Sequence, residues 1–190
     1  MKRSLVVLSL VSLVFAGVAS AEVKKGDVML DFLAGWTQQN FSDEAGGGDL
    51  SVFFGAVRPG IALTDNIRVA GVAAVADVSN DIDVTVWTLG VSGEYVFMPA
   101  NTLNPYVGAM FAWASADADI GLVDGDGIGG GDSMDGWLLA PRVGVLYTLN
   151  RANNLFGEFQ YQFWGGDVGD LLDNGFMLLF GIEHKFRVGQ

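Results

Sequence analysis

The last stretch of the chain, residues 175–186, alternates strictly between two kinds of side chain. One face carries Phe176, Leu178, Phe180, Ile182, His184 and Phe186, and the other carries Gly175, Met177, Leu179, Gly181, Glu183 and Lys185. A repeat of two residues is the period of a β-strand. A strand with one continuous apolar face and a few charges on the other suits a wall between lipid and an enclosed interior. We therefore expect the closing strand of a membrane barrel.

Seven upstream segments repeat this pattern and are separated by turns or polar, glycine-rich loops. They are residues 28–38, 50–63, 67–78, 82–97, 105–114, 136–148 and 154–164. With the last stretch they make eight strands of roughly ten residues, the size of tilted outer-membrane strands. The predicted fold is all-β: an eight-stranded antiparallel up-and-down transmembrane β-barrel.

The first residues have the pattern of a secretory signal peptide. Lys2 and Arg3 precede the apolar run 5–18, and Ala19, Ser20 and Ala21 form a small-residue cleavage site. We expect residues 1–21 to be a cleavable signal peptide and residues 22–190 to be one outer-membrane β-barrel domain. The alternative is an uncleaved interfacial anchor.

The composition excludes several classes of function. The formal net charge of −12 argues against a nucleic-acid partner, which would need a basic patch. The chain has no cysteine, so disulfides and thiolate metal sites are excluded. The glycine-rich segment 127–131 lacks the Lys-Ser/Thr pair of a phosphate-binding loop. We expect no cofactor.

Alternation alone also fits a soluble barrel with an apolar interior. Two features favour the membrane. The less apolar face has many small residues where a solvated surface would have charges, and a narrow eight-stranded interior needs small side chains. These residues include Ala56, Gly60, Ala74, Gly90, Gly108, Ala112, Ala140 and Gly144. Short connections after the second, fourth and sixth strands also contrast with longer acidic loops after the first, fifth and seventh, the usual asymmetry of outer-membrane barrels.

The aromatic residues are sorted by height along the strands, as interfacial girdles require. With the N-terminus in the periplasm, the predicted outer girdle is Trp36, Trp87, Trp113 and Trp137, and the predicted inner girdle is Tyr95, Tyr147 and Phe186. The alternation along their strands places Trp164 and Tyr106 on the interior face instead, so these two fit the girdles less well.

Three short motifs resemble a known family. They are the Leu-Thr-Asp-Asn turn at 63–66, the Pro-Tyr-Val-Gly segment at 105–108, and the terminal Gly-Ile-Glu-His-Lys-Phe at 181–186. The chain resembles the small eight-stranded outer-membrane β-barrel proteins, the OmpA-like transmembrane and opacity-type group. The resemblance implies a bacterial outer-membrane location, outer-membrane lipids as surroundings, a monomer, and recognition of the C-terminal strand by the barrel assembly machinery. His184 and the tail after Phe186 depart from the usual terminal signal.

Charged residues of opposite sign share the interior face of the strands. They are Asp31, Arg58, Arg68, Glu94, Arg142, Glu158, Glu183 and Lys185. Because isolated buried charges are costly, we expect these four acids and four bases to pair and plug the barrel. The alternatives are separate contacts with trapped water, or a gate in which partner exchange opens a narrow conduit.

The predicted function is non-enzymatic: a plugged barrel that contributes to envelope integrity and surface contacts. The alternatives are a narrow porin-like channel for ions or small solutes, and an adhesin that acts through its acidic external loops. The Asp-Gly-Asp-Gly sequence at 124–127 resembles part of a calcium loop but lacks the bidentate Glu. His184, the single histidine, lies near the inner rim, where a Ser-His-acid triad would not be expected.

Overall fold

The computed structural model describes residues 23–40, 49–79, 83–119 and 133–186. The strands are β1 (Val28–Asn40), β2 (Asp49–Ala62), β3 (Ile67–Ser79), β4 (Asp83–Val96), β5 (Leu103–Asp119), β6 (Ser133–Thr148), β7 (Asn153–Gly166) and β8 (Gly175–Phe186). A short helix, α2 (Asp167–Leu171), lies between β7 and β8. Within these described ranges, no helix combines the length and the apolar character needed to cross a membrane.

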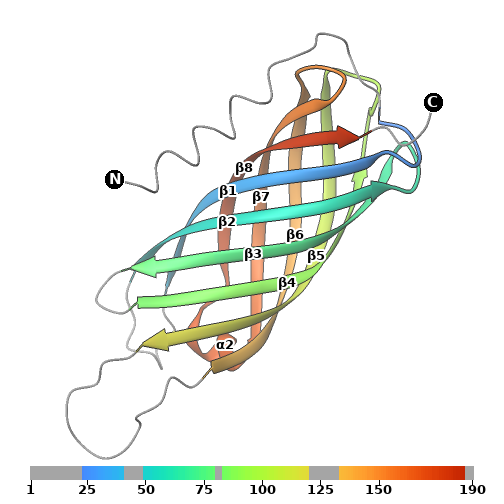
Figure 1. Cartoon of the computed structure of the whole chain (residues 1–190). Coiled ribbons are helices and arrows are strands. Elements are labelled where there is room, and N and C mark those ends of the chain that lie inside the picture. Colours follow the sequence, from blue (N-terminus) through green and yellow to red (C-terminus); the bar gives the residue numbers. More distant parts are fainter. Residues whose placement is uncertain (1–22, 41–48, 80–82, 120–132, 187–190) are drawn as a thin grey trace, which may run out of the picture.

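Each strand pairs with its neighbours in sequence, and β1 pairs with β8 to close the barrel (Figure 1). All pairs are antiparallel, and the closing ladder runs from Val28 opposite Phe186 to Gln38 opposite Phe176. Closure removes the free strand edges that lipid could not satisfy with hydrogen bonds. The predicted eight-stranded antiparallel barrel is confirmed.

The two ends of the barrel differ. The short connections 63–66, 97–102 and 149–152 lie at one end, called here the turn end. The opposite end carries α2 and is called here the loop end (Figure 1). β8 begins at the loop end and finishes at the turn end, so Phe186 lies at the turn end.

The strands are longer at the loop end than the sequence pattern predicts. The prediction of an irregular stretch from Ser115 to Asp135 is wrong at both ends, because β5 continues to Asp119 and β6 begins at Ser133. The ladder between these strands includes the pair Asp117 and Ser133. Small and acidic residues mask the alternation there, but cross-strand hydrogen bonds do not depend on side-chain polarity.

The segment 165–174 was also expected to be a loop, and the structure corrects this. β7 extends through Gly166, and α2 follows at once. Gly166 has a φ of 74°, a left-handed conformation that favours glycine and allows the strand to turn directly into the helix.

Candidate functional site: a charged layer across the barrel interior

Seven interior side chains form one continuous series of alternating acids and bases. In order, the series is Asp31, Arg58, Glu158, Arg142, Glu94, Arg68 and Glu183. We call these seven residues the charged layer. They come from seven strands, and residues far apart in sequence meet because the strands surround one narrow interior.

One half of the layer centres on Glu158 of β7. Arg58 Nε donates to Asp31 Oδ2 at 3.1 Å, and Arg58 Nη1 donates to Glu158 Oε2 at 3.0 Å. Arg142 Nη1 donates to the same Oε2 at 3.1 Å. The guanidinium of Arg58 also lies over the ring of Phe156, 5.1 Å from its centroid, within the range of a cation–π contact. Glu158 therefore connects two arginines on opposite sides.

The other half centres on Arg68 of β3. Arg142 Nη2 donates to Glu94 Oε2 at 2.9 Å, which joins the two halves. Arg68 Nη1 donates to Glu94 Oε1 at 3.3 Å and to Glu183 Oε2 at 2.8 Å. The three arginines, Glu158 and Glu183 are buried. Burial of charges is tolerable only when each has partners, and this series supplies them.

Neutral groups also donate to two of the four carboxylates, Glu158 and Glu183. The hydroxyl of Tyr106, from β5, donates to Glu158 Oε2 at 2.6 Å, and the side-chain amide of Gln160 donates to Glu158 Oε1. Asn154 Nδ2 donates to Glu183 Oε1, while Lys185 Nζ donates to Asn154 Oδ1 at 3.5 Å. Of the eight predicted interior charges, seven thus form the layer, and Lys185 connects to it through Asn154.

Two glycines make room for the layer. A Cβ on Gly108 would lie 3.1 Å from Arg142 Nε and 3.0 Å from the Cβ of Glu94. A Cβ on Gly144 would overlap the ring of Tyr106, which lies across that glycine. The alternation of residues places Tyr106 in the interior but does not indicate this role, which depends on its position opposite Gly144.

Packed side chains fill the interior at this level. The cavity beside Asp31, Arg68, Ser92 and Glu94 has a volume of about 10 Å³. This is close to the minimum that holds one water molecule. The charged layer therefore closes the barrel in this conformation.

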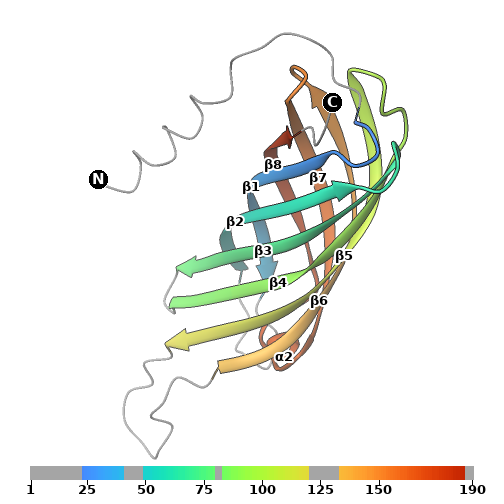
Figure 2. The ribbon, with the colours of Figure 1, turned by 45° about the vertical axis from the view of Figure 1, so that its right-hand side comes forward.

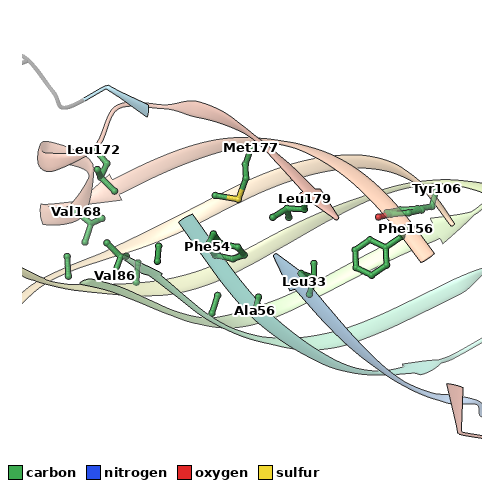
Figure 3. Close-up of a cluster of buried hydrophobic side chains, with 14 of the residues drawn as sticks. Leu33, Phe54, Ala56, Val86, Tyr106, Phe156, Val168, Leu172, Met177 and Leu179 are labelled. Carbon is green, nitrogen blue, oxygen red and sulfur yellow. The ribbon is translucent and has the colours of Figure 1, made fainter. Parts of the chain in front are cut away.

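Between the charged layer and the loop end, the interior is mainly apolar, although Thr37, Thr88 and Gln162 are also buried there. Figure 3 shows this apolar compartment extending from Tyr106 and Phe156 to Val168 and Leu172. Its buried residues include Leu33, Phe54, Met177 and Leu179, and a second cluster contains Val72, Met110 and Leu138. Val168 is fully buried, and a Cβ on Gly136 would overlap it. Val168 of α2 and Leu172, directly after the helix, thus cover the interior at the loop end beside β5, β6 and β7.

The exterior is apolar, and the predicted girdle residues all lie on it. Trp36, Trp87, Trp113 and Trp137 are exposed toward the loop end, whereas Tyr95, Tyr147 and Phe186 are exposed toward the turn end. Tyr106 is buried and Trp164 packs against the interior clusters, as their parity indicates. An exterior of this kind is stable in a lipid bilayer.

His184 is half-buried near the turn end. Its Nδ1 lies 2.8 Å from Asn153 Oδ1, and its ring contacts that of Phe186 edge to face, with centroids 4.5 Å apart. Within the described residues, no group of three or more His, Cys, Asp or Glu side chains is arranged to hold a metal ion. The Asp-Gly-Asp-Gly sequence at 124–127 lies outside these residues.

No protein-family model matches the chain, and no curated protein matches it. Solved structures do. The match to Neisserial surface protein A spans 85% of this chain and 100% of that protein, with a TM-score of 0.69 and 19% identity. The match to the outer membrane protein OprG from Pseudomonas aeruginosa spans 87% of this chain and 98% of that protein, with a TM-score of 0.56 and 17% identity.

The N-terminal β-barrel domain of OprF from Pseudomonas aeruginosa has a TM-score of 0.53 and 15% identity, and it covers 85% of this chain over 98% of its own. At these identities the likeness concerns the fold. With this fold, and with an apolar exterior bounded by aromatic side chains, the chain has the architecture of the small eight-stranded outer-membrane β-barrels.

Proposed function

We propose that this protein is a non-catalytic, closed barrel of the bacterial outer membrane that contributes to envelope integrity and surface contacts. The observation that carries the proposal is the charged layer, which fills the barrel interior at one level with ion pairs. Val168 of α2 and the following Leu172 also pack over the interior beside β5, β6 and β7. A barrel filled with side chains serves as a stable membrane element rather than as a wide pore.

The electrical test uses planar lipid bilayers. We expect the wild-type barrel to show no steady conductance, because the cavity in the charged layer is as small as one water molecule. Steady single-channel openings by the wild-type protein would contradict a closed barrel. In the host bacterium, loss of the gene should increase entry of detergents and large dyes, and the wild-type gene should reverse this effect.

A narrow channel is the second candidate, and the alternation of the charged layer favours it. Arg142 and Arg68 each lie between two carboxylates, so a change of partner would move a charged side chain without leaving it unpaired. The test is the conductance of Arg142→Ala beside the wild type. Higher conductance in the variant would support a gate, and identical, negligible conductance in both would exclude one.

Several further expectations belong to this proposal. We infer that residues 1–21 direct export, that the barrel is a monomer, and that the assembly machinery recognises β8. Phe186→Ala should then reduce the amount of heat-modifiable, folded protein in the membrane. An unchanged amount would show that Phe186 is not part of such a signal. The adhesin alternative concerns the acidic loops, of which residues 41–48, 80–82 and 120–132 lie outside the described residues.

A further inference from the structure

The membrane-facing wall of the barrel has a groove on its loop-end half. It crosses β2, β3, β4 and β5, which lie next to one another in the wall (Figure 2). The groove has a volume of about 450 Å³, far larger than the cavity inside the charged layer. The groove lies on the outside of the barrel, whereas the ion pairs of the charged layer lie in its interior.

The strand register explains why the groove forms. One row across the four strands consists of Gly55, Val75, Trp87 and Ser115, which are successive cross-strand partners. The next row toward the turn end consists of Val57, Ala73, Leu89 and Trp113. The small Gly55, Ala73 and Ser115 therefore lie among larger side chains, above all Trp87, Leu89 and Trp113, and the difference in side-chain height leaves a groove.

The floor and the walls of the groove have different exposures. A Cβ added to Gly55 would meet no atom within 4 Å, so this position opens outward. Leu89 is 71% exposed although it belongs to a regular strand. Its cross-strand neighbours are the small Ala73 and the exposed Trp113, which leaves one side of the leucine without contacts. Within a bilayer, lipid must supply those contacts.

We propose that this groove binds one acyl chain of a lipid in the leaflet on the loop side. The lining is almost entirely apolar, so it offers little to a polar solute. Trp87 and Trp113 belong to the exposed loop-end aromatics, which lie at the headgroup level of a bilayer. An acyl chain that runs from that level toward the bilayer centre contacts Gly55 and Ala73, which form the floor of the groove.

The size and shape of the groove favour a lipid chain over a second copy of the protein. Eleven residues line it, whereas a stable protein interface uses roughly 20–30 residues on each side. Association within a bilayer depends on close packing, because lipid tails are as apolar as leucine side chains. A flexible chain can follow the groove, and the surrounding annular lipids contact only the raised side chains.

The test is native mass spectrometry of the full barrel released from bilayers of dimyristoyl phosphatidylcholine. We expect the wild type to keep one lipid at a collision energy that removes the others. The double variant Gly55→Leu/Ala73→Leu fills the groove, and its lipid-bound fraction should fall about tenfold, the change that corresponds to about 1.4 kcal/mol. Heat-modifiable gel mobility checks that each variant folds.

Gly157→Leu is the matched control. This glycine also opens outward, on β7, and a Cβ there would make an ordinary contact with Phe180 at 3.6 Å. It lies outside the groove, so its lipid retention should equal that of the wild type. If the double variant fails to fold, Leu89→Ala replaces it. This change removes part of the groove wall and should lower the lipid-bound fraction.

Three outcomes would overturn the proposal. They are a wild type that keeps no lipid, a groove variant that keeps lipid as the wild type does, and a wild-type dimer that the groove variant abolishes. The last result would assign the groove to a second copy of the chain.

Discussion

On one level of the barrel interior, three arginines lie between four carboxylates. On the next level toward the loop end, Leu33, Leu138 and Leu179 pack among alanines and methionines. Both levels are filled with buried side chains, but their energetics differ. Apolar packing is non-directional and tolerates volume-conserving changes. The charged layer depends on the position of each donor and acceptor, because a buried charge that loses its partner is costly.

Because of this difference, the two levels stabilise the barrel in different ways. The apolar compartment lies beneath α2, where Val168 and Leu172 extend the same packing. The charged layer instead cross-links strands on opposite sides of the barrel, as Arg58 of β2 and Glu158 of β7 show. We therefore expect changes in the charged layer to affect the whole barrel, and changes in the apolar compartment to have more local effects.

The largest effect is expected from Glu158→Ala. Arg58, Arg142, Tyr106 and Gln160 all donate to this carboxylate, and its removal leaves Arg58 and Arg142 each without one of two carboxylate partners. We expect the free energy of unfolding to fall by about 3–5 kcal/mol, measured by urea titration in lipid vesicles with heat-modifiable mobility as the readout. The control is Asp167→Asn at an exposed position of α2, which should stay within about 0.5 kcal/mol of the wild type. Equal effects of the two variants would contradict a stabilising layer.

The next effect is expected in the apolar compartment. Leu138 is 2% exposed, and Leu138→Ala should lower the free energy of unfolding by about 3 kcal/mol, through lost transfer energy and a residual cavity. The adjacent Leu139 faces the lipid and provides the control, because Leu139→Ala leaves no internal cavity. The same urea titration should give the smaller loss for Leu139→Ala. A reversed order would show that the apolar compartment does not pack tightly.

The smallest effect is expected from Tyr106→Phe, which removes one hydrogen bond at the boundary between the two levels. The tyrosine hydroxyl donates to a carboxylate, and such bonds contribute about 1.5 kcal/mol or somewhat more. Tyr95→Phe, on the exposed turn-end girdle, is the control, and unfolding of both variants is followed in urea. If Tyr106→Phe cost no more than Tyr95→Phe, the hydroxyl of Tyr106 would add nothing to the charged layer.

The alternation of residues shows which side chains share a face, and that was enough to predict the barrel. Residues such as Trp87 and Glu94 lie on opposite faces of β4 as their parity requires. The same reasoning missed the strand extensions at Asp119 and Ser133 and the helix α2. Polar residues in those segments are equally compatible with loops, so only backbone pairing distinguishes the two.

For the candidate site, the alternation of residues is enough to predict which charged residues face inward, because the strand period is a local property. The position of Arg142 between Glu94 and Glu158, and the bonds from Tyr106 and Gln160 to Glu158, arise only in the closed barrel. Those contacts depend on the stagger of the strands around the closed barrel, which no single strand encodes. The groove has the same origin, since it arises where Gly55 and Ala73 align with Trp87 and Leu89 across the β2–β3 and β3–β4 ladders.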